Sequence, residues 1–293
     1  MNILVTGSNG QLGQELKTLK NSYPHWNFLF TDVKELDILD PKAIELWMVE
    51  KNITAIINCA AYTAVDKAET EKEKAYAVNE QGVKNLAEVC KALDIPLLHI
   101  STDYVFDGDK KTPYLETDTP NPTGVYGASK LAGEIALQEL WHKHIILRVS
   151  WVFGAHGHNF VKTMLRLSET RDELGVVNDQ FGAPTGAKSI ADCLLDIIEK
   201  NQFNKSGFPW GLYHYQSEPG VSWYDFAGDI FAQAKNVGLL NKDMLINPIS
   251  SDQFPTPVKR PENSKLDGNK INQALNLPAG DWKNQLLDML KAI

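Results

Sequence analysis

The sequence predicts an α/β fold, namely a Rossmann-like doubly wound parallel sheet with a smaller, mostly C-terminal α/β domain. Three observations support this prediction. Short apolar segments alternate with helical patterns through the first half of the chain, a glycine-rich turn follows the first apolar segment, and a Ser-Thr-Asp segment lies late in the fourth. Continuously apolar segments are typical of strands buried on both faces, and their alternation with helices gives a parallel sheet with right-handed crossovers.

The expected elements follow these patterns in chain order. In the first half we expect strands over residues 2–7, 27–32, 54–61, 96–106 and 144–153. Helices are expected over 11–20, from Pro41 with Asp40 as N-cap, over about 70–93, and around the YGASK segment at 126–130. In the second half we expect helices over 160–169, 189–200 and 222–235, the last with Ser222 as N-cap, and a strand over 174–181.

The first strand is followed by the turn GSNGQLG at residues 7–13. Glycines also serve plain tight turns, but this turn follows a strand and opens a helix inside a β-α-β unit. Gly7, Gly10 and Gly13 would let the backbone approach a pyrophosphate, whose charge the helix N-terminus stabilises. We therefore interpret residues 1–150 as a dinucleotide-binding domain.

Asp32 ends the second expected strand, nineteen residues after Gly13. A carboxylate at this place can accept hydrogen bonds from both hydroxyls of the adenosine ribose, which favours NADH, and it would repel the 2′-phosphate of NADPH. Lys34 is close in sequence and could weaken this discrimination. The alternative is that Asp32 only caps the following loop.

The catalytic candidates are Thr102, Tyr126 and Lys130. Ligands of such folds bind beyond the carboxyl ends of the strands, so the hydroxyls of Ser101 and Thr102 should face that site. A hydride that reaches a carbonyl carbon produces an alkoxide, which needs a proton and a hydrogen-bond donor. Tyr126 could supply the proton if the Lys130 ammonium lowers its pKa, and Thr102 could donate to the same oxygen. The alternatives are that Tyr126 and Lys130 are only neighbours on one helix face, and that Ser101 serves the backbone turn.

After Gly154 the alternation loosens, and we interpret residues 151–293 as mainly a substrate-binding domain, with some segments that return to the first domain. Arg260 lies in a loop otherwise poor in cations and is a candidate partner for a substrate diphosphate. A surface salt bridge is the alternative for this residue.

The composition argues against several partners and compartments. A net charge of −8 and a pI near 5.4 disfavour nucleic acid or an anionic membrane as the main partner. The N-terminus enters a strand without a signal segment, and no apolar stretch approaches the ~20 residues of a membrane-spanning helix. The three cysteines are far apart and odd in number, so we expect reduced thiols in a cytoplasmic protein. A homodimer is compatible with the sequence.

The motifs taken together resemble a known family. GSNGQLG, STD and YGASK are similar to motifs of the extended short-chain dehydrogenase/reductases, in which a Ser or Thr, a Tyr and a Lys handle a sugar-nucleotide carbonyl. Longer segments, among them STDYVFDG, GVYGASKLAGE, NDQFGAPTGA and RPENSKL, resemble the dTDP-4-dehydrorhamnose reductases, from Met1 through the C-terminal helix. The resemblance implies that NADH or NADPH reduces the 4-keto group of dTDP-6-deoxy-L-lyxo-4-hexulose to give dTDP-L-rhamnose.

The resemblance also implies roles for individual residues. Tyr126 donates the proton, Thr102 binds the keto oxygen, and Lys130 binds the nicotinamide ribose and tunes Tyr126. Asn79 has a structural and proton-relay role. The other implied contacts are Gly10, Gln11 and Leu12 with the pyrophosphate; Asp32, Asp37 and Ile38 around the adenosine; Ala61, Tyr62 and Thr63 along the cofactor; and Thr102, Asp103 and Trp151 with the sugar nucleotide.

One position departs from the family. Some members join subunits through carboxylate-bound magnesium, whereas this chain has Lys188 just after GAPTGA, and no carboxylate or cysteine cluster accompanies His156 and His158. We therefore expect no metal. Two other functions stay open: another nucleotide-sugar reductase or epimerase of the same fold, and a regulatory subunit that binds dinucleotide without turnover.

Overall fold

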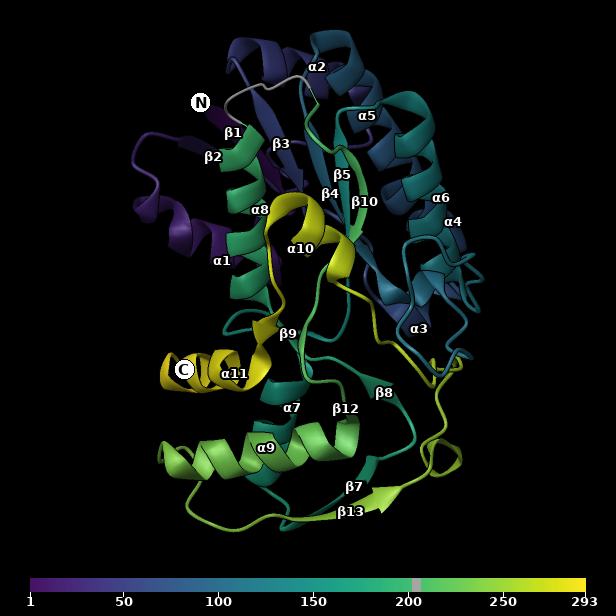
Figure 1. The fold of residues 1–293 in the computed structure, drawn as a ribbon, viewed down its shortest axis with the longest axis vertical. Coiled ribbons are helices and arrows are strands. Elements are labelled where there is room, and N and C mark those ends of the chain that lie inside the picture. The colour runs from purple at the N-terminus through teal and green to yellow at the C-terminus, as the bar shows by residue number, and fades with distance from the viewer. Residues whose placement is uncertain (202–206) are drawn as a thin grey trace.

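The computed structural model describes residues 1–201 and 207–293, and a six-stranded parallel sheet forms its centre (Figure 1). The strands are ordered β10-β5-β4-β3-β1-β2, and every neighbouring pair is parallel. Their bounds are β1 Asn2–Thr6, β2 Asn27–Phe30, β3 Ala55–Asn58, β4 Leu97–Thr102, β5 His144–Val149 and β10 Gly211–His214. The predicted doubly wound α/β fold is confirmed.

The strand order reverses at β1. This strand pairs with β2 on one side and with β3 on the other, and the later strands continue outward from β3. In open parallel sheets such a switch point leaves a crevice at the carboxyl ends of the strands, and ligands bind there. The segments that follow β1, β2 and β3 are therefore expected to meet around one ligand site.

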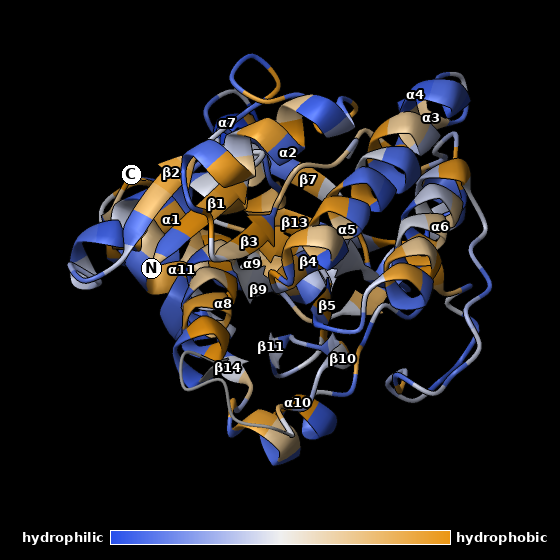
Figure 2. Ribbon diagram, turned by 90° about the horizontal axis from the view of Figure 1, so that it is seen from above, coloured by the Kyte–Doolittle hydropathy of each residue, from blue (hydrophilic) through white to orange (hydrophobic). Residues whose placement is uncertain are grey.

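Helices cover both faces of this sheet, and Figure 2 shows them on its two sides. One face is covered by α1 Gln11–Leu19 and α8 Ala187–Asn201. The other face is covered by α2 Pro41–Glu50, α5 Gly82–Leu93 and α6 Val125–Leu140. The Asp40 carboxylate accepts hydrogen bonds from the backbone N–H groups of Lys42 and Ala43, each at 3.0 Å, so its predicted role as the N-cap of α2 is confirmed.

A second, smaller lobe lies beyond the carboxyl ends of the strands (Figure 1). It contains α7 Phe160–Ser168, α9 Trp223–Asn236, α11 Trp282–Lys291 and the parallel pair of β7 Glu173–Val177 and β13 Leu245–Ile249. These elements enclose their own apolar core, with Phe226 and Trp282 fully buried at its centre. Ser222 and Asp225 form a complete capping box at the start of α9, as the sequence predicts for Ser222.

Two segments of the second half return to the central sheet. β10 forms its edge beside β5, and α8 packs against α1. α10 Asn269–Leu275 joins the same apolar cluster. The remaining short elements are α3 Val65–Ala68, α4 Lys72–Tyr76, β6 Val152–Phe153, β8 Phe181–Gly182, β9 Thr185–Gly186, β11 Ser217–Glu218, β12 Val221–Ser222 and β14 Gly280–Asp281.

Several predicted strands end earlier than the apolar pattern suggests, and two of these breaks bear on the site. The strand expected over 96–106 stops at Thr102, whose hydroxyl accepts the N–H of Tyr104 at 3.2 Å and begins a 3₁₀ turn. The strand expected over 144–153 breaks at Trp151, which has a left-handed φ of 46°. Both breaks turn the chain at the carboxyl end of the sheet, and Asp103, Tyr104 and Trp151 of these segments line the site.

Candidate active site

A cavity of about 1120 Å³ lies at the carboxyl ends of the strands. Its lining comes from the segments that follow β1, β2, β3, β4 and β5, together with α6 and the start of α7. Every site residue predicted from the sequence lines it: Gly7, Gly10, Gln11, Leu12, Gly13, Asp32, Asp37, Ile38, Ala61, Tyr62, Thr63, Thr102, Asp103, Tyr126, Lys130, Trp151 and Arg260. The fold thus brings all of these residues to one place.

The glycine turn is shaped by close backbone contacts. Gly7 has a φ of +61°, and a Cβ atom there would lie 2.5 Å from the backbone N of Ala60. A Cβ at Gly13 would lie 2.5 Å from the Cα of Ser8, so the turn closes tightly on α1. Gly10 is the N-cap of α1 and supplies no capping side chain, and the first turn holds no acidic residue. The helix amides are therefore available to an anion, which fits a dinucleotide pyrophosphate.

Asp32 holds the glycine turn as well as facing the cavity. Its Oδ2 atom accepts the N–H of Asn9 at 3.1 Å, and its Oδ1 atom accepts the N–H of Val33 at 2.9 Å. The structure thus shows Asp32 capping backbone N–H groups, which was the alternative to a ribose contact. Each carboxylate oxygen has a further lone pair, so the same group can also accept from ribose hydroxyls.

Tyr126 lies in the first turn of α6, next to Thr102 at the end of β4. The Glu69 carboxylate accepts the N–H of Val125 at 2.7 Å and so caps this helix from a distant segment. Burial raises the pKa of Tyr126, and the Thr102 hydroxyl opposes this shift. The expected lowering by Lys130 does not contribute to the pKa of Tyr126 in this structure, where the Nζ atom of Lys130 contacts His99 and the backbone O of Ile100.

Lys130 is turned into the protein interior. Its Nζ atom donates to the backbone O of Ile100 at 2.7 Å and lies 3.2 Å from Nε2 of His99, and the residue is only 2% exposed. Burial lowers the pKa of Lys130 to about 8, and the charge of Glu134 opposes the shift. A solvated lysine titrates near ~10.4, so this amine is poised to change charge close to neutral pH.

Ser101 does not serve the backbone turn. Its hydroxyl donates to Glu134 of α6, and that carboxylate also receives Nε and Nη2 of Arg148 at 2.9 and 2.6 Å. Arg148 and Glu134 form an ion pair that is 2% and 1% exposed. This network fastens α6 to β4 and β5, because its members come from all three elements.

Asn79 lies in a π-helical turn over Ala77–Gln81, which interrupts the helix expected over 70–93. Its Oδ1 atom accepts the N–H of Tyr62 at 2.8 Å, and its Nδ2 group donates to the Tyr62 O and to the Ser129 hydroxyl, both at 3.0 Å. The implied structural role is thus visible, since Asn79 fixes the backbone of a cavity residue. All of these contacts are structural, and none reaches Tyr126 or Lys130 side chains directly.

Asp103 and Arg260 each present an unsatisfied buried atom. Within the described residues, Oδ2 of Asp103 and Nη1 of Arg260 have no hydrogen-bond partner. Burial raises the pKa of Asp103 to about 6. Arg260 also forms an ion pair with Asp66 at 2.6 Å, so the salt-bridge alternative is observed while one amino group stays available at the cavity.

Trp151 stacks on an aromatic side chain of the smaller lobe. Its ring lies on Trp223 with centroids 3.4 Å apart and an interplanar angle of 9°. Gly182 packs on the other side, where a Cβ would lie 2.3 Å from the Trp151 ring. The predicted substrate residue is therefore rigidly held where the lobe meets the cavity.

The loop between β6 and α7 belongs to the site but was not predicted from the sequence. Its residues 157–160 line the cavity. Asn159 caps α7 and donates to the Gln11 side chain at 2.8 Å, and Gly157 lies over the same residue with a φ of +66°. The sequence signal for this loop is the glycine and asparagine of AHGHN before a helix, whereas only His156 and His158 of this segment entered the prediction, as candidate metal ligands.

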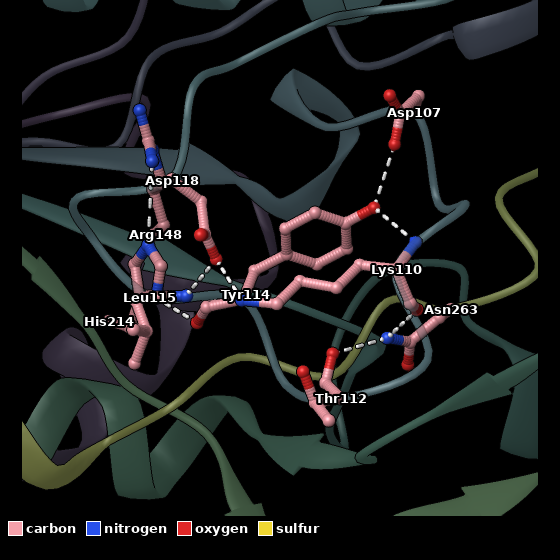
Figure 3. Close-up of polar contacts among 9 residues, drawn as sticks. All are labelled: Asp107, Lys110, Thr112, Tyr114, Leu115, Asp118, Arg148, His214 and Asn263. Carbon is pink, nitrogen blue, oxygen red and sulfur yellow. Dashed lines mark hydrogen bonds and ion pairs between the residues drawn. The ribbon is translucent and has the colours of Figure 1, made fainter.

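A polar cluster around the buried residues Tyr114 and His214 ties the loop before α6 to the second half of the chain (Figure 3). Tyr114 donates from its hydroxyl to Asp107 at 2.8 Å, and its backbone O lies 3.0 Å from Nδ1 of His214. Asn263 donates to the backbone O of Lys110 at 2.7 Å. The loop that precedes α6 is therefore held by β10 and by the C-terminal segment.

A cavity of this kind at the switch point, with a Tyr-Lys helix beside it, defines a nucleotide-dependent oxidoreductase of the short-chain dehydrogenase/reductase class. The chain belongs to the family described as RmlD substrate binding domain, whose model matches residues 1–293. The dTDP-4-dehydrorhamnose reductase of Aggregatibacter actinomycetemcomitans is 46% identical, over 97% of this chain and 96% of that protein. The resemblance stated from the sequence motifs is confirmed.

Solved structures agree with this family. A dTDP-4-dehydrorhamnose reductase of Clostridium acetobutylicum has a TM-score of 0.90 at 39% identity, and the match covers 100% of this chain and 99% of that one. The dTDP-4-dehydrorhamnose reductase of Bacillus anthracis in complex with NADP has a TM-score of 0.91 at 35% identity, with the same coverage.

Over residues 1–201 and 207–293, no group of three or more His, Cys, Asp or Glu side chains is placed to hold a metal ion. No helix in this part of the chain is long and apolar enough to cross a membrane.

Proposed function

We propose that the chain is an NAD(P)H-dependent oxidoreductase that reduces the 4-keto group of dTDP-4-dehydro-L-rhamnose (dTDP-6-deoxy-L-lyxo-4-hexulose) to dTDP-L-rhamnose, in dTDP-rhamnose biosynthesis. One observation carries the chemistry: Tyr126 and Thr102 lie together in the cavity that begins at the glycine turn. The full-length similarity to dTDP-4-dehydrorhamnose reductases supplies the substrate class.

The cofactor would lie across the switch point. The uncapped N-terminus of α1 and the glycines of its turn would hold the pyrophosphate, and Asp32 would accept from the adenosine ribose. Tyr62, whose backbone Asn79 fixes, would line the path toward the nicotinamide. The bound NAD(P)H supplies a hydride to the carbonyl carbon of the sugar.

The protein residues would complete the reduction at the keto oxygen. Hydride addition breaks the C–O π bond and leaves an alkoxide, and Tyr126 gives this oxygen its phenolic proton. Thr102 donates a hydrogen bond to the same oxygen while the charge develops. Lys130 would bind the nicotinamide ribose and, once charged, stabilise the phenolate that Tyr126 becomes. Solvent then returns the proton to Tyr126.

The sugar nucleotide would enter from the smaller lobe. Asp103 and Trp151 would contact the sugar, and Nη1 of Arg260 would donate to the diphosphate. A guanidinium held by Asp66 keeps its orientation, so the unpaired amino group stays aimed at the cavity. A homodimer is a further proposal, and light scattering distinguishes it from a 32.7 kDa monomer.

The test is the oxidation of NADH and of NADPH by the purified protein with the 4-keto sugar nucleotide. We expect oxidation that depends on this sugar, with dTDP-glucose, which has no keto group, as the control. Equal rates with and without the keto sugar, or no oxidation of either cofactor, would refute the proposal. Tightly retained NAD in the purified protein would instead indicate an epimerase.

A further inference from the structure

A chain of buried polar side chains lies behind Lys130 and is not used by the proposed reaction. Asn58 in β3 and His99 in β4 are both 0% exposed. The Thr6 hydroxyl donates to Oδ1 of Asn58 at 2.6 Å. Nδ2 of Asn58 lies 2.9 Å from Nδ1 of His99, and Nε2 of His99 lies 3.2 Å from Nζ of Lys130. The chain thus runs from β1 across β3 and β4 to the catalytic helix.

The backbone fixes the orientation of the Asn58 amide. The N–H of Ala60 can only donate, and it lies 3.1 Å from the Oδ1 atom of Asn58. The Nδ2 group must therefore face His99, so Nδ1 of that ring accepts and carries no proton. Burial, and then the charge of Lys130, lower the pKa of His99 well below its ordinary value. The ring is neutral, and its single proton is on Nε2.

This Nε2–H group points at the amine of Lys130. An ammonium group has hydrogen-bond donors and no lone pair. A charged Lys130 would therefore place two donors, its Nζ and the Nε2–H of His99, 3.2 Å apart with no acceptor between them. A neutral amine can accept from His99 while it donates to the backbone O of Ile100. We propose that His99 is a positioning residue that favours the neutral amine of Lys130 over its ammonium, and that at alkaline pH Lys130 takes up a proton from solvent when it engages the nicotinamide ribose.

The inference rests on the proposed function, which places Lys130 at that ribose. The ionisable groups on α6 leave the amine without a strong anionic partner. Glu134 lies one turn along the helix, but its carboxylate is held by Arg148. Tyr126 is an uncharged phenol, because burial raises its pKa.

The neighbouring strands add no charge to the amine. Cys59, which follows β3, is an uncharged thiol, since burial raises its pKa to about 12. His144 of β5 has a pKa lowered by burial, and it further disfavours a charged His99. Burial therefore lowers the pKa of Lys130 to about 8, so the group is a neutral amine above this pH and an ammonium below it.

The first experiment reads the tautomer of His99 directly. Long-range ¹H–¹⁵N correlation spectra of the histidine rings are recorded without added cofactor at roughly one pH unit above the Lys130 pKa of about 8, where the amine is neutral, and His99→Leu assigns the signals. We expect the neutral ring with its proton on Nε2. A ring with its proton on Nδ1, or a charged ring, would overturn the inference whatever the enzyme reduces.

The second experiment measures NADH and NADPH affinity against pH. We expect constant affinity below the pKa of Lys130, about 8, and weakening above it by up to about tenfold per pH unit. In His99→Leu the pH at which cofactor affinity begins to fall should rise by roughly up to one unit, because one hydrogen bond to the neutral amine is lost. His142→Leu, which removes an exposed histidine, is the control and should keep the parent profile.

A second variant covers the case in which His99→Leu does not fold. Asn58→Asp places an acceptor at the Nδ2 position, so the ring carries its proton on Nδ1 and offers a lone pair to Lys130. The pH at which cofactor affinity begins to fall should again rise. Two results would overturn the inference but not the proposed function. One is cofactor binding that is independent of pH, and the other is an affinity that begins to fall at the parent pH in both variants. Absence of binding by either cofactor at every pH would overturn the proposed function itself.

Discussion

Tyr126 keeps its proton in the cofactor-free protein, and this suits a proton donor. Burial raises the pKa of the phenol, so the group is protonated at neutral pH. A sugar alkoxide is far more basic than a phenolate, so the transfer from Tyr126 is favourable once hydride has been added. The remaining requirement is a nearby cation for the phenolate, and Lys130 is the residue placed to provide it.

Tyr126→Phe removes this donor and should lower kcat by ~10²–10⁴-fold. Cofactor affinity should change little, because the ring and its contact with Tyr104 remain. Steady-state kinetics and a fluorescence titration of NADH measure the two effects. Tyr224→Phe in α9 is the matched control, and turnover of Tyr126→Phe within a few-fold of the parent would contradict the assignment.

Lys130→Met should weaken cofactor binding and raise stability at the same time. The folded-state pKa of about 8 lies below the ~10.4 of a solvated lysine, so the folded protein binds fewer protons between these pH values. The parent is therefore destabilised below about pH 8 and becomes more stable as the pH rises through this window. At pH 7 the variant should gain about 1–3 kcal/mol in free energy of unfolding, less at pH 10.

Urea unfolding at several pH values measures this gain, with the exposed Lys91→Met as control. The alkaline limb of the pH-rate profile should also move upward, because Tyr126 loses the charge that stabilises its phenolate. If Tyr126 and Lys130 were only neighbours on one helix face, Lys130→Met would lower the free energy of unfolding by only a few tenths of a kcal/mol and leave the kinetics like those of the parent. That result would refute the catalytic role.

Asp32→Ala should shift the cofactor preference toward NADPH by several-fold, because it removes repulsion of the 2′-phosphate. The ratio of kcat/KM for the two cofactors measures the shift. Asp40→Ala is a useful control, since it also removes a backbone cap but lies outside the cavity lining. An unchanged ratio in Asp32→Ala would mean that Asp32 only holds the glycine turn.

At the scale of elements, α6 is placed by contacts on several sides. The Glu134–Arg148 pair fastens it to β5, and the π-helical turn approaches it so closely that only glycine fits at position 133. A Cβ at Gly133 would lie 2.0 Å from the backbone O of Asn79. The contact therefore sets the distance between the helix of Tyr126 and the segment that holds Tyr62.

Gly133→Ala should force these two elements apart and lower the free energy of unfolding by roughly 1–3 kcal/mol. Thermal and urea unfolding measure the loss. Gly228→Ala in α9 is the control, because its Cβ would meet only a side chain at 3.5 Å; it should be neutral or stabilising by up to about 1 kcal/mol. Equal stability of the two variants would show that the helix contact can relax.

At the scale of the whole molecule, the site is assembled from both halves of the chain. The turn before α1, the strand ends and α6 belong to the first half, whereas Asn159 and Arg260 come from the second. Asn159 contacts the Gln11 side chain, and Arg260 contacts Asp66. A ligand in this cavity therefore binds both lobes together.

Saturating NADPH should stabilise the folded protein by about 3 kcal/mol at a hundredfold excess over Kd. Differential scanning calorimetry should show one transition that moves upward, since both apolar cores border the ligand site. Nicotinamide mononucleotide, which lacks the adenosine half, should give a smaller shift. Two transitions, of which only one responds, would show that the lobes unfold independently.

The sequence by itself determined the sheet class, the glycine turn and the Tyr-Lys helix. These features depend on local rules, namely apolar runs, turn chemistry and the four-residue spacing along a helix. The caps at Asp40 and Ser222 were predictable for the same reason, because a side chain meets backbone groups two or three residues away.

Only the tertiary structure decided the partners and charge states of the site. Ser101 meets Glu134, and Lys130 meets His99, across about thirty positions of sequence; the loop at Asn159 reaches back to Gln11. Such contacts depend on how strands and helices pack, and no local pattern records them. Desolvation has the same origin, so the shift that turns Lys130 from an ordinary surface cation into a titratable amine arises only when the fold closes over it.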